Sequence, residues 1–412
     1  MASADGSDWN RHRRCTAAAF SENVNEKVWE RSGQEASKIS AEFLSRESVS
    51  DTRSSMIRIS FTVLLEACMG VGSNDRAIDT DEPGPDVATA ENDLTTLLRI
   101  LRPRPTSIIE RLWFLRRNKT DLFTARCERL SKFISALICY RRGHPLPRKD
   151  LLASMIEYKD EKMLTDEEIR GNLFLFMFAG HETTANTLLY IVYLLAIFPH
   201  WQSWAAEEID AFVSTSGPNS NLTYREIFPR LKRLQAIMYE TLRLYGPVVN
   251  IMRKTSSSQY QPEKVTTFDS RDVMIPGNVR INIMTPALHT DPEYWGPDSL
   301  SWNPGRWMKY SADNKNAAPG LASEKLDQSK IDHLLSWADG ARVCPGKRFS
   351  QFEIIAVLLN LFVQARVEVV PGPSMNLDEA QVEALKAVQQ SRTALTLQMQ
   401  EPSSVRLGWC LR

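Results

Sequence analysis

Apolar side chains recur at intervals of three and four residues along most of the chain, which is the spacing of one helix face. This pattern predicts helices over residues 9–20, 26–44, 94–101, 122–139, 201–213, 233–244 and 349–365. A more continuous apolar run over residues 56–69 predicts a buried helix. Clusters of β-branched residues between turns predict strands over residues 265–268, 273–275, 279–283, 367–370 and 395–399. The expected fold class is therefore mainly α with small β-sheets.

The best-marked helix is predicted over residues 166–198. Thr165 and Glu168 have the spacing of a capping box, in which each side chain satisfies a backbone N–H of the other residue. Asp166 and Glu167 place negative charge in the first turn, where the helix dipole favours it. A helix of this length is roughly 50 Å long and crosses a whole domain. Its middle is therefore expected to be buried.

The composition is that of a globular protein with a large core, since 43% of the 412 residues are hydrophobic and 24% are charged. We expect one domain over residues 1–412, with surface loops over the polar stretches 72–91 and 311–330. The 50 basic residues balance 50 acidic ones, which argues against a dedicated nucleic-acid binder. The cysteines are scattered and form no C-x-x-C pair, so neither a paired-cysteine metal site nor a small disulfide scaffold is expected.

Residues 337–346 combine a cysteine with glycines in a loop that directly precedes a predicted apolar helix. Gly340 and Gly346 allow the backbone to approach a flat ligand closely, because glycine has no side chain to collide with it. Free N–H groups at the start of the helix stabilise a thiolate at Cys344. Arg342 lies two residues away and can pair with an anionic substituent. The alternative for the cysteine alone is an ordinary core residue before a helix.

Polar residues interrupt the middle of the long apolar helix. A carboxylate and hydroxyls are costly there unless they are used, because the preceding run 173–178 is apolar. The Thr183 hydroxyl can donate to the Ala179 carbonyl and open the helix locally, and Gly180 leaves room for a small ligand. The alternative is a polar helix face toward solvent. A zinc-protease motif fails because alanine stands four residues after His181.

Two further pairs occur at helical spacing. Glu240 and Arg243 face one another at i and i+3, and alone they would form a surface ion pair worth well under about 1 kcal/mol. Trp9 and Arg13 share one face of the first helix at i and i+4. The alternative for this helix is a basic amphipathic segment at the surface.

Together these segments resemble the cytochrome P450 family, whose haem loop reads Phe-x-x-Gly-x-Arg-x-Cys-x-Gly. Gly340, Arg342, Cys344 and Gly346 match this pattern, and Trp337 stands in place of the phenylalanine. The motifs follow one another in the family order, and the resemblance extends from the first helix to the C-terminus. In its general amino-acid pattern the chain resembles eukaryotic, microsomal-type members, above all the fungal ones, with the N-terminal part truncated.

The resemblance implies a haem b cofactor with Cys344 as the axial thiolate ligand of the iron, a ligand that favours O–O cleavage. Cationic and aromatic side chains would hold the haem carboxylates, namely Arg342, Trp9, Arg13 and, as a further candidate, Arg253.

The same resemblance assigns roles to the two other motifs. Glu182 and Thr183 would supply protons during oxygen activation. Glu240 and Arg243 would join Arg306 in a buried cluster that fixes the cysteine loop.

The implied activity is that of a monooxygenase, which places one atom of O2 in a lipophilic organic substrate while the other becomes water. Electrons would come from NADPH through NADPH-cytochrome P450 reductase, a flavoprotein. A basic patch would be formed by Arg11, Arg14, Lys347 and Arg348. It would dock this reductase by electrostatic attraction, or it would be a solvated face with no partner. We expect a monomer with no nucleic-acid partner. A haem-thiolate isomerase, dehydratase or peroxygenase and an inactive truncated haem-binding remnant stay open as other interpretations.

For the full-length family the resemblance implies the cytosolic face of the endoplasmic reticulum membrane. No anchor is visible in this chain, since its first residues are polar and no stretch has the roughly 20 apolar residues that span a bilayer. We also expect the chain to lack the first strands of the small sheet and the loop before the Trp9 helix.

Overall fold

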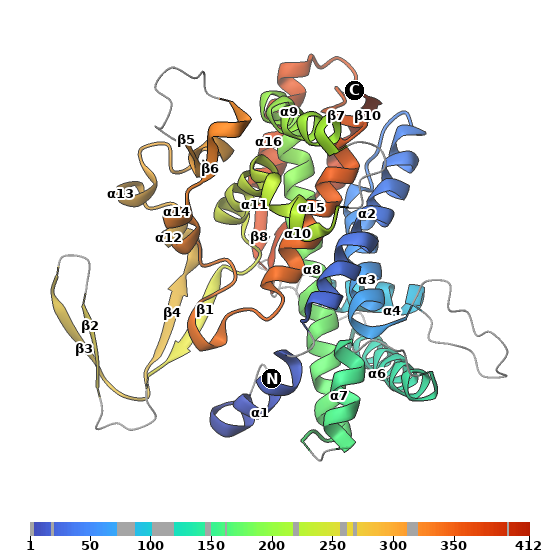
Figure 1. The fold of residues 1–412 in the computed structure, drawn as a ribbon, viewed down its shortest axis with the longest axis vertical. Coiled ribbons are helices and arrows are strands. Elements are labelled where there is room, and N and C mark those ends of the chain that lie inside the picture. Colours follow the sequence, from blue (N-terminus) through green and yellow to red (C-terminus); the bar gives the residue numbers. More distant parts are fainter. Residues whose placement is uncertain are drawn as a thin grey trace.

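The computed structural model describes residues 4–17, 20–71, 87–100, 119–144, 150–160, 163–216, 222–255, 262–266, 270–310, 320–393 and 395–412, and all structural statements concern these. This part of the chain is mainly helical with small sheets, as the sequence predicts (Figure 1). The longer helices are α1 (Gly6–Ala17), α2 (Glu22–Leu44), α3 (Thr52–Met69), α4 (Val87–Ile100), α6 (Lys119–Gly143), α7 (Leu151–Asp160), α8 (Asp166–Ile197), α9 (Pro199–Ser216), α11 (Lys232–Tyr245), α15 (Lys347–Phe362) and α16 (Leu377–Gln389).

Shorter helical segments connect these elements. They are α10 (Tyr224–Ile227), α12 (Thr285–His289), α13 (Pro292–Trp295) and α14 (Gln328–Asp332), with the 3-10 turns η1 (Phe228–Arg230), η2 (Pro304–Trp307), η3 (Leu321–Ser323), η4 (Gly340–Arg342) and η5 (Pro402–Ser404).

Helix α8 runs through the middle of the molecule (Figure 1). It begins at the predicted capping box, because Thr165 Oγ1 accepts from the Glu168 N–H at 3.2 Å and the Glu168 carboxylate accepts from the Thr165 N–H at 2.8 Å. Every residue from Thr184 to Ile197 is buried. Helix α3 packs along α8, and α2 packs along α15. The predicted burial of this helix is therefore confirmed for its C-terminal half.

The strands pair two by two into small antiparallel sheets. The pairs are β1 (Asn250–Lys254) with β4 (Arg280–Met284), β2 (Glu263–Thr266) with β3 (Asp272–Ile275), β5 (Met308–Tyr310) with β6 (Glu324–Leu326), β7 (Ala365–Val369) with β10 (Leu407–Leu411), and β8 (Ser391–Thr393) with β9 (Leu397–Met399). Strand β1 matters most for the site, because its Ile251 is buried opposite Ile283 of β4 and reaches the cavity described below.

The two predicted surface loops are not loops throughout. Residues 311–319 lie outside the described residues, but β6 and α14 occupy most of 324–330. Glu324 of β6 is buried and pairs with Arg233 of α11 at 2.8 Å, so an ion pair rather than apolar content fixes this segment. In the other predicted loop, residues 72–86 lie outside the described residues and α4 begins at Val87.

Apolar periodicity alone does not find α16, β1 and β10. Helix α16 does carry a signal of its own, because Asn376 and Glu379 form a capping box at its start.

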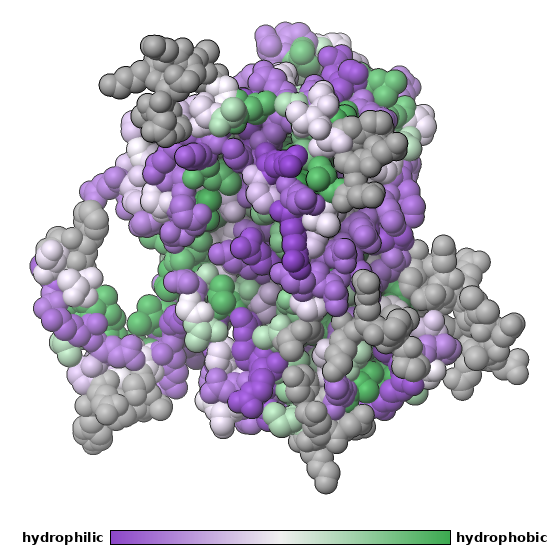
Figure 2. All heavy atoms as spheres, viewed as in Figure 1, coloured by the Kyte–Doolittle hydropathy of each residue, from purple (hydrophilic) through white to green (hydrophobic). Residues whose placement is uncertain are grey.

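Hydrophobic side chains lie exposed along the outer sheets (Figure 2). They are Val265, Val273 and Met274 on the β2–β3 pair, and Met252 and Met284 on the β1–β4 pair. Within the described ranges, no helix by itself has the length and hydropathy needed to cross a bilayer, and α8 with α9 meets the test only as a pair bent by 108°.

Candidate functional site

A large apolar cavity lies between α8 and the loop that carries Cys344. It contains about 1250 Å³ of atom-free space, part of which is open to solvent. Helix α8 contributes Thr183 to the wall, and the loop contributes Cys344. Phe20, Phe176 and Ile251 add apolar surface from the segment before α2, from α8 and from β1. The two chemistry-bearing segments of the sequence therefore face one cavity.

The cysteine loop, residues 336–346, is closed by hydrogen bonds at both of its ends. The Cys344 N–H donates to the Trp337 carbonyl at 2.8 Å, and the Trp337 indole N–H donates to Ser350 Oγ on α15 at 2.9 Å. Between them Gly340 has φ +71°, a left-handed conformation that glycine adopts without steric cost. Trp337 thus fixes the loop to α15 through an N–H that the family's phenylalanine lacks.

The Cys344 thiol is accessible on the cavity wall. The apolar surroundings raise the pKa of this thiol, whereas the Gly346 N–H and the positive charges of Arg13 and Lys347 oppose the shift. These three groups favour the thiolate, which is the form of cysteine that binds a metal.

Arg342 and Trp9 lie together at the rim of the cavity. The Arg342 guanidinium lies over the Trp9 ring at 4.7 Å from its centroid. It also donates to the Asp5 carboxylate at 2.7 Å and to the Ala4 carbonyl at 3.0 Å. Since Arg342 lines the cavity, these contacts attach α1 to the rim.

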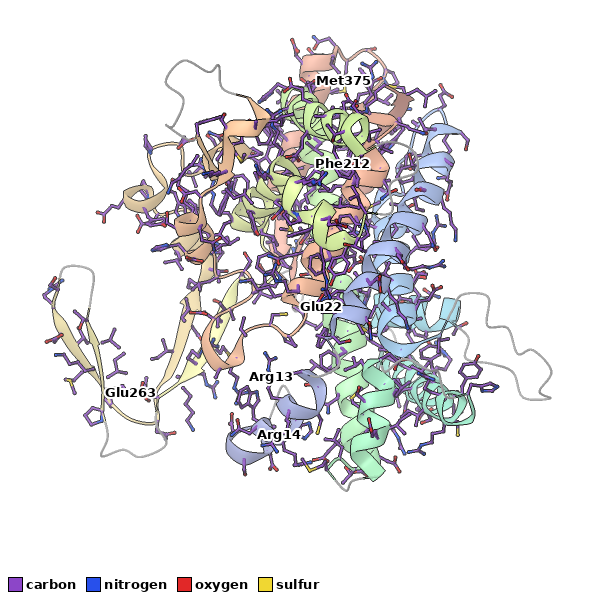
Figure 3. All side chains as sticks on the ribbon, viewed as in Figure 1. Arg13, Arg14, Glu22, Phe212, Glu263 and Met375 are labelled. Atoms are coloured by element: carbon purple, nitrogen blue, oxygen red, sulfur yellow. The ribbon has the colours of Figure 1, made fainter. Side chains whose placement is uncertain are left out.

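The two other candidates for carboxylate binding lie near the same loop. Arg13 is half-buried on the side of α1 toward the centre of the molecule, whereas Arg14 is exposed (Figure 3). No hydrogen bond or ion pair engages the Arg13 guanidinium within the described ranges, although its charge acts on Cys344. Arg253 of β1 donates to the Asp339 carbonyl of the cysteine loop at 3.2 Å.

The predicted hydrogen bond within α8 is present, since Thr183 Oγ1 donates to the Ala179 carbonyl at 2.9 Å. The helix stays continuous through this point. Gly180 lines the cavity, as its predicted role requires, and it has a second role in packing. A Cβ there would lie 3.2 Å from both δ-carbons of Leu64, so the glycine permits close packing of α8 on α3.

Glu182 does not line the cavity. Its carboxylate accepts a hydrogen bond from the Gln398 amide of β9, and the residue is buried. Burial raises the pKa of this carboxyl group, and the hydrogen bonds from Thr396 and Gln398 oppose the shift. Because consecutive residues point in different directions on a helix with 3.6 residues per turn, only Thr183 of the predicted pair faces the cavity.

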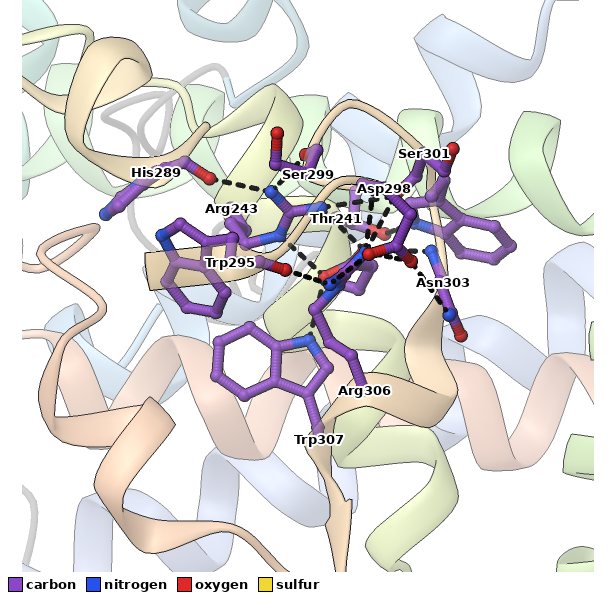
Figure 4. A network of polar contacts seen from close by, with 12 residues as sticks. Thr241, Arg243, His289, Trp295, Asp298, Ser299, Ser301, Asn303, Arg306 and Trp307 are labelled. Atoms are coloured by element: carbon purple, nitrogen blue, oxygen red, sulfur yellow. Dashed lines mark hydrogen bonds and ion pairs between the residues drawn. The ribbon is translucent and has the colours of Figure 1, made fainter. Parts of the chain in front are cut away.

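Arg243 and Arg306 belong to one polar network (Figure 4), in which both bind the buried carboxylate of Glu240. Arg243 donates twice to the Glu240 carboxylate, at 2.8 Å each, and Arg306 Nε donates to it at 3.0 Å. The Asn303 N–H at 2.8 Å and the Trp307 indole N–H at 2.9 Å complete its set of donors. A buried carboxylate with this many donors is fully compensated for the loss of water.

His289 connects this network to the cysteine loop and is not predicted from the sequence. Its carbonyl accepts from Arg243 Nη1 at 2.6 Å (Figure 4), and its Nε2 accepts from the Leu335 N–H at 3.1 Å, just before the loop. In addition, Ser336 Oγ donates to the Leu242 carbonyl of α11 at 3.1 Å. Helix α11 therefore holds the start of the loop at two points, through His289 of the network and directly at Ser336.

The cytochrome P450 family model matches residues 1–394, nearly the whole chain. The chain belongs to the cytochrome P450 family. Curated relatives include a cytochrome P450 monooxygenase of Arthrobotrys oligospora, 32% identical over 250 residues that cover 58% of this chain and 42% of that protein. The phomenoic acid biosynthesis cluster cytochrome P450 monooxygenase of Leptosphaeria maculans is 27% identical over 412 residues, covering 89% of this chain and 67% of that protein.

Solved P450 structures show the same fold. The crystal structure of the cytochrome P450 CYP102L1 aligns with a TM-score of 0.69 at 19% identity and covers 99% of this chain and 80% of that one. The haem domain of cytochrome P450DA aligns with a TM-score of 0.67 at 20% identity, covering 97% and 76%. This P450 chain spans about two fifths to two thirds of the length of the two fungal relatives, 42% and 67%.

Membership in the family implies a haem cofactor, and the residues of this P450 fit one. The cavity has apolar walls, as a porphyrin requires, and the Cys344 thiol is accessible on its wall. Cations for the haem carboxylates are available at Arg342 on the rim and at Arg13, whose guanidinium makes no hydrogen bond or ion pair within the described residues.

The structure corrects the sequence-based prediction for Arg11 and adds Glu353, which was not predicted. Arg11 is not part of a free basic surface, because its guanidinium donates to the Glu168 carboxylate at 2.6 and 2.9 Å. Glu353 of α15 is missed altogether, although it is fully buried and interacts with Thr184. An acidic residue inside the apolar run 349–365 is the signal that would have found it.

Proposed function

We propose that this P450 chain is the haem-bearing part of a monooxygenase that places one atom of O2 in a lipophilic organic substrate. The observation that carries the proposal is the pairing of Cys344 and Thr183 on the walls of one apolar cavity. The fungal relatives support the reaction class, because their names describe monooxygenases. NADPH, through a flavoprotein reductase, is the proposed source of electrons, and the cytosolic face of the endoplasmic reticulum membrane stays a prediction.

Haem with a cysteine thiolate ligand, when bound, supplies an iron centre that activates dioxygen. We assign Cys344 to hold the iron. The two haem carboxylates would be held by Arg342, Arg13 and Arg253, because a guanidinium forms strong charge-assisted hydrogen bonds with carboxylates. Trp9 would add the N–H donor of its indole ring.

The substrate side of the cavity selects for apolar molecules. Leu175, Phe176, Val248 and Ile251 line it from α8 and from the segment that leads into β1. Apolar walls bind lipophilic compounds by releasing water from both surfaces, and they keep water away from the reacting atoms.

Thr183 and Glu182 have distinct tasks in this proposal. Thr183 lines the cavity, and we assign its hydroxyl to contact the reacting atoms. Glu182 is buried behind it, and its raised pKa favours a carboxyl group that retains a proton. To pass that proton to the cavity, the Glu182 side chain must leave Gln398, which holds it in the structure.

Replacing the ligand sulfur tests the proposed haem site. The purified chain is loaded with haemin, reduced and exposed to carbon monoxide, and the absorption spectrum is recorded. Cys344→Ser should lose the band of thiolate-ligated haem, because that band requires a sulfur ligand and serine supplies only oxygen. Cys139→Ser, which removes an exposed thiol elsewhere, should keep the band. An unchanged spectrum in Cys344→Ser would contradict the proposal.

A further inference from the structure

Helix α1 is held mainly by polar contacts. Its buried residues are His12, Cys15 and Thr16, so a single apolar side chain of this helix enters the core. At its N-terminal end, Arg342 of the cysteine loop binds Asp5 and stacks on Trp9. The orientation of α1 therefore depends on what its polar side chains meet on the opposite face.

The opposite face of α1 meets the first turns of α8. Arg11 donates to both carboxylate oxygens of Glu168, at 2.6 and 2.9 Å, and to the Met163 carbonyl at 2.7 Å. His12 Nε2 lies 3.2 Å from the same Glu168 carboxylate, and its Nδ1 lies within 3.3 Å of the Asn172 amide. The Glu168 carboxylate thus contacts two consecutive residues of α1.

Glu168 is well suited to hold this contact. It belongs to the capping box of α8, which orients its side chain, and a two-pronged guanidinium–carboxylate contact adds directional strength. The bonds from Arg11 hold the pKa of the Glu168 carboxyl group far below its usual range, so the residue stays charged at any physiological pH.

We propose that Glu168 is a positioning residue for the haem carboxylates, acting through Arg11 and His12. When these two residues are fixed against α8, the other face of α1 presents Trp9 and Arg13 toward the cysteine loop. The contact also joins the helix of Thr183 to the helix that would hold the cofactor. This inference rests on the proposed haem site and adds to it a residue that touches neither haem nor substrate.

The test uses the rate at which the haem-loaded chain gives up haem to an excess of apomyoglobin. Glu168→Gln removes the charge but keeps an oxygen acceptor for the capping box. Haem should leave this variant about tenfold faster. Replacing a residue that orients ligand-binding side chains typically weakens binding by about this factor. Glu167→Gln, an exposed acid in the same turn, is the matched control and should release haem at the original rate.

A second measurement separates positioning from a general effect on folding. In an Arg13→Gln background, Glu168→Gln should accelerate haem loss by less than it does alone, because the two residues act on one contact. Arg11→Gln should reproduce the effect of Glu168→Gln, and the double variant should be no faster than either. Should Glu168→Gln fail to fold, Arg11→Gln replaces it. Its acceleration of haem loss is then compared with and without Arg13→Gln.

The outcomes distinguish this inference from the proposed function. If the unmodified chain takes up no haem, the proposed function fails first. If it binds haem and Glu168→Gln releases it no faster than Glu167→Gln, only the positioning role is overturned. Additive effects of Glu168→Gln and Arg13→Gln would also overturn it.

Discussion

Two buried ionisable residues should make the stability of this protein depend on pH. Burial raises the pKa of the Glu353 carboxyl group from its ordinary value to about 8, although interactions with Ser60 and Thr184 oppose the shift. Burial has the reverse effect on the His289 imidazole and lowers its pKa to about 4. Both side chains therefore favour their neutral forms in the folded state.

Glu353→Gln should make the protein more stable at alkaline pH. Between the ordinary pKa near 4.5 and the raised pKa near 8, the folded state binds the Glu353 proton more tightly than the unfolded state. The stability from this residue is thus complete below about pH 4.5 and declines by up to about 1.4 kcal/mol per pH unit as the pH rises toward 8. Glutamine cannot ionise and avoids this loss. Urea unfolding at pH 5 and pH 8 measures it.

The advantage of Glu353→Gln over the unmodified chain should therefore widen from pH 5 to pH 8. Glu383→Gln removes an exposed carboxyl group of α16 and is the control for loss of a negative charge. An advantage that does not change with pH would mean that Glu353 is ionised in the folded protein.

At the scale of the element, burial determines how much an ion pair at a given helical spacing contributes to stability. Glu240 and Arg243 of α11 have side chains that are 0% exposed, whereas Glu383 and Lys386 of α16 have the same i,i+3 spacing but are 56% exposed. Removing one partner of a buried pair leaves an uncompensated charge, which costs about 3–5 kcal/mol. The exposed pair is worth less than about 1 kcal/mol.

Arg243→Ala should therefore lower the free energy of unfolding by about 3–5 kcal/mol and abolish haem incorporation. The haem loss follows because Arg243 contacts His289, which receives the N–H of Leu335 at the start of the cysteine loop. Lys386→Ala is the control and should leave both quantities nearly unchanged. Urea unfolding and haem content per chain are the measurements. Normal haem content in a folded Arg243→Ala protein would remove the role assigned to the network.

The sequence predicts those features that depend on neighbours along the chain. The Thr165 capping box and the bond from Thr183 to Ala179 are local, and both are present. Features that depend on packing are not accessible in the same way. Apolar periodicity cannot show that Leu64 fills the space beside Gly180, nor that His289 connects α11 to the cysteine loop.

The same distinction applies to the motif residues of the site. A pattern match gives Glu182 and Thr183 one shared role, but their side chains leave α8 in different directions. Only the packing of β9 against the helix decides that Glu182 meets Gln398. The side chain of Arg306 reaches Glu240 for a similar reason, since the turn at η2 lies beside α11.

At the scale of the whole molecule, the cavity lies between well-buried helices and a helix with few apolar contacts. Helices α8 and α15 are buried over most of their length, whereas α1 enters the core through Cys15 alone among its apolar residues. A ligand that binds both the cysteine loop and α1 adds contacts mainly to the weaker part. Haem binding should therefore suppress local opening of α1 more than opening elsewhere.

Limited digestion with trypsin measures this local opening. Arg14 of α1 is exposed, but cleavage after it requires the helix to unfold locally, so its rate follows the population of the open form. Haem loading should slow cleavage at Arg14 because Trp9 and Arg13 then hold the haem carboxylates. Cleavage after Lys386, on α16 away from the cavity, should change much less. Equal protection at the two sites would mean that haem stabilises the fold globally and that α1 gains nothing of its own from the ligand.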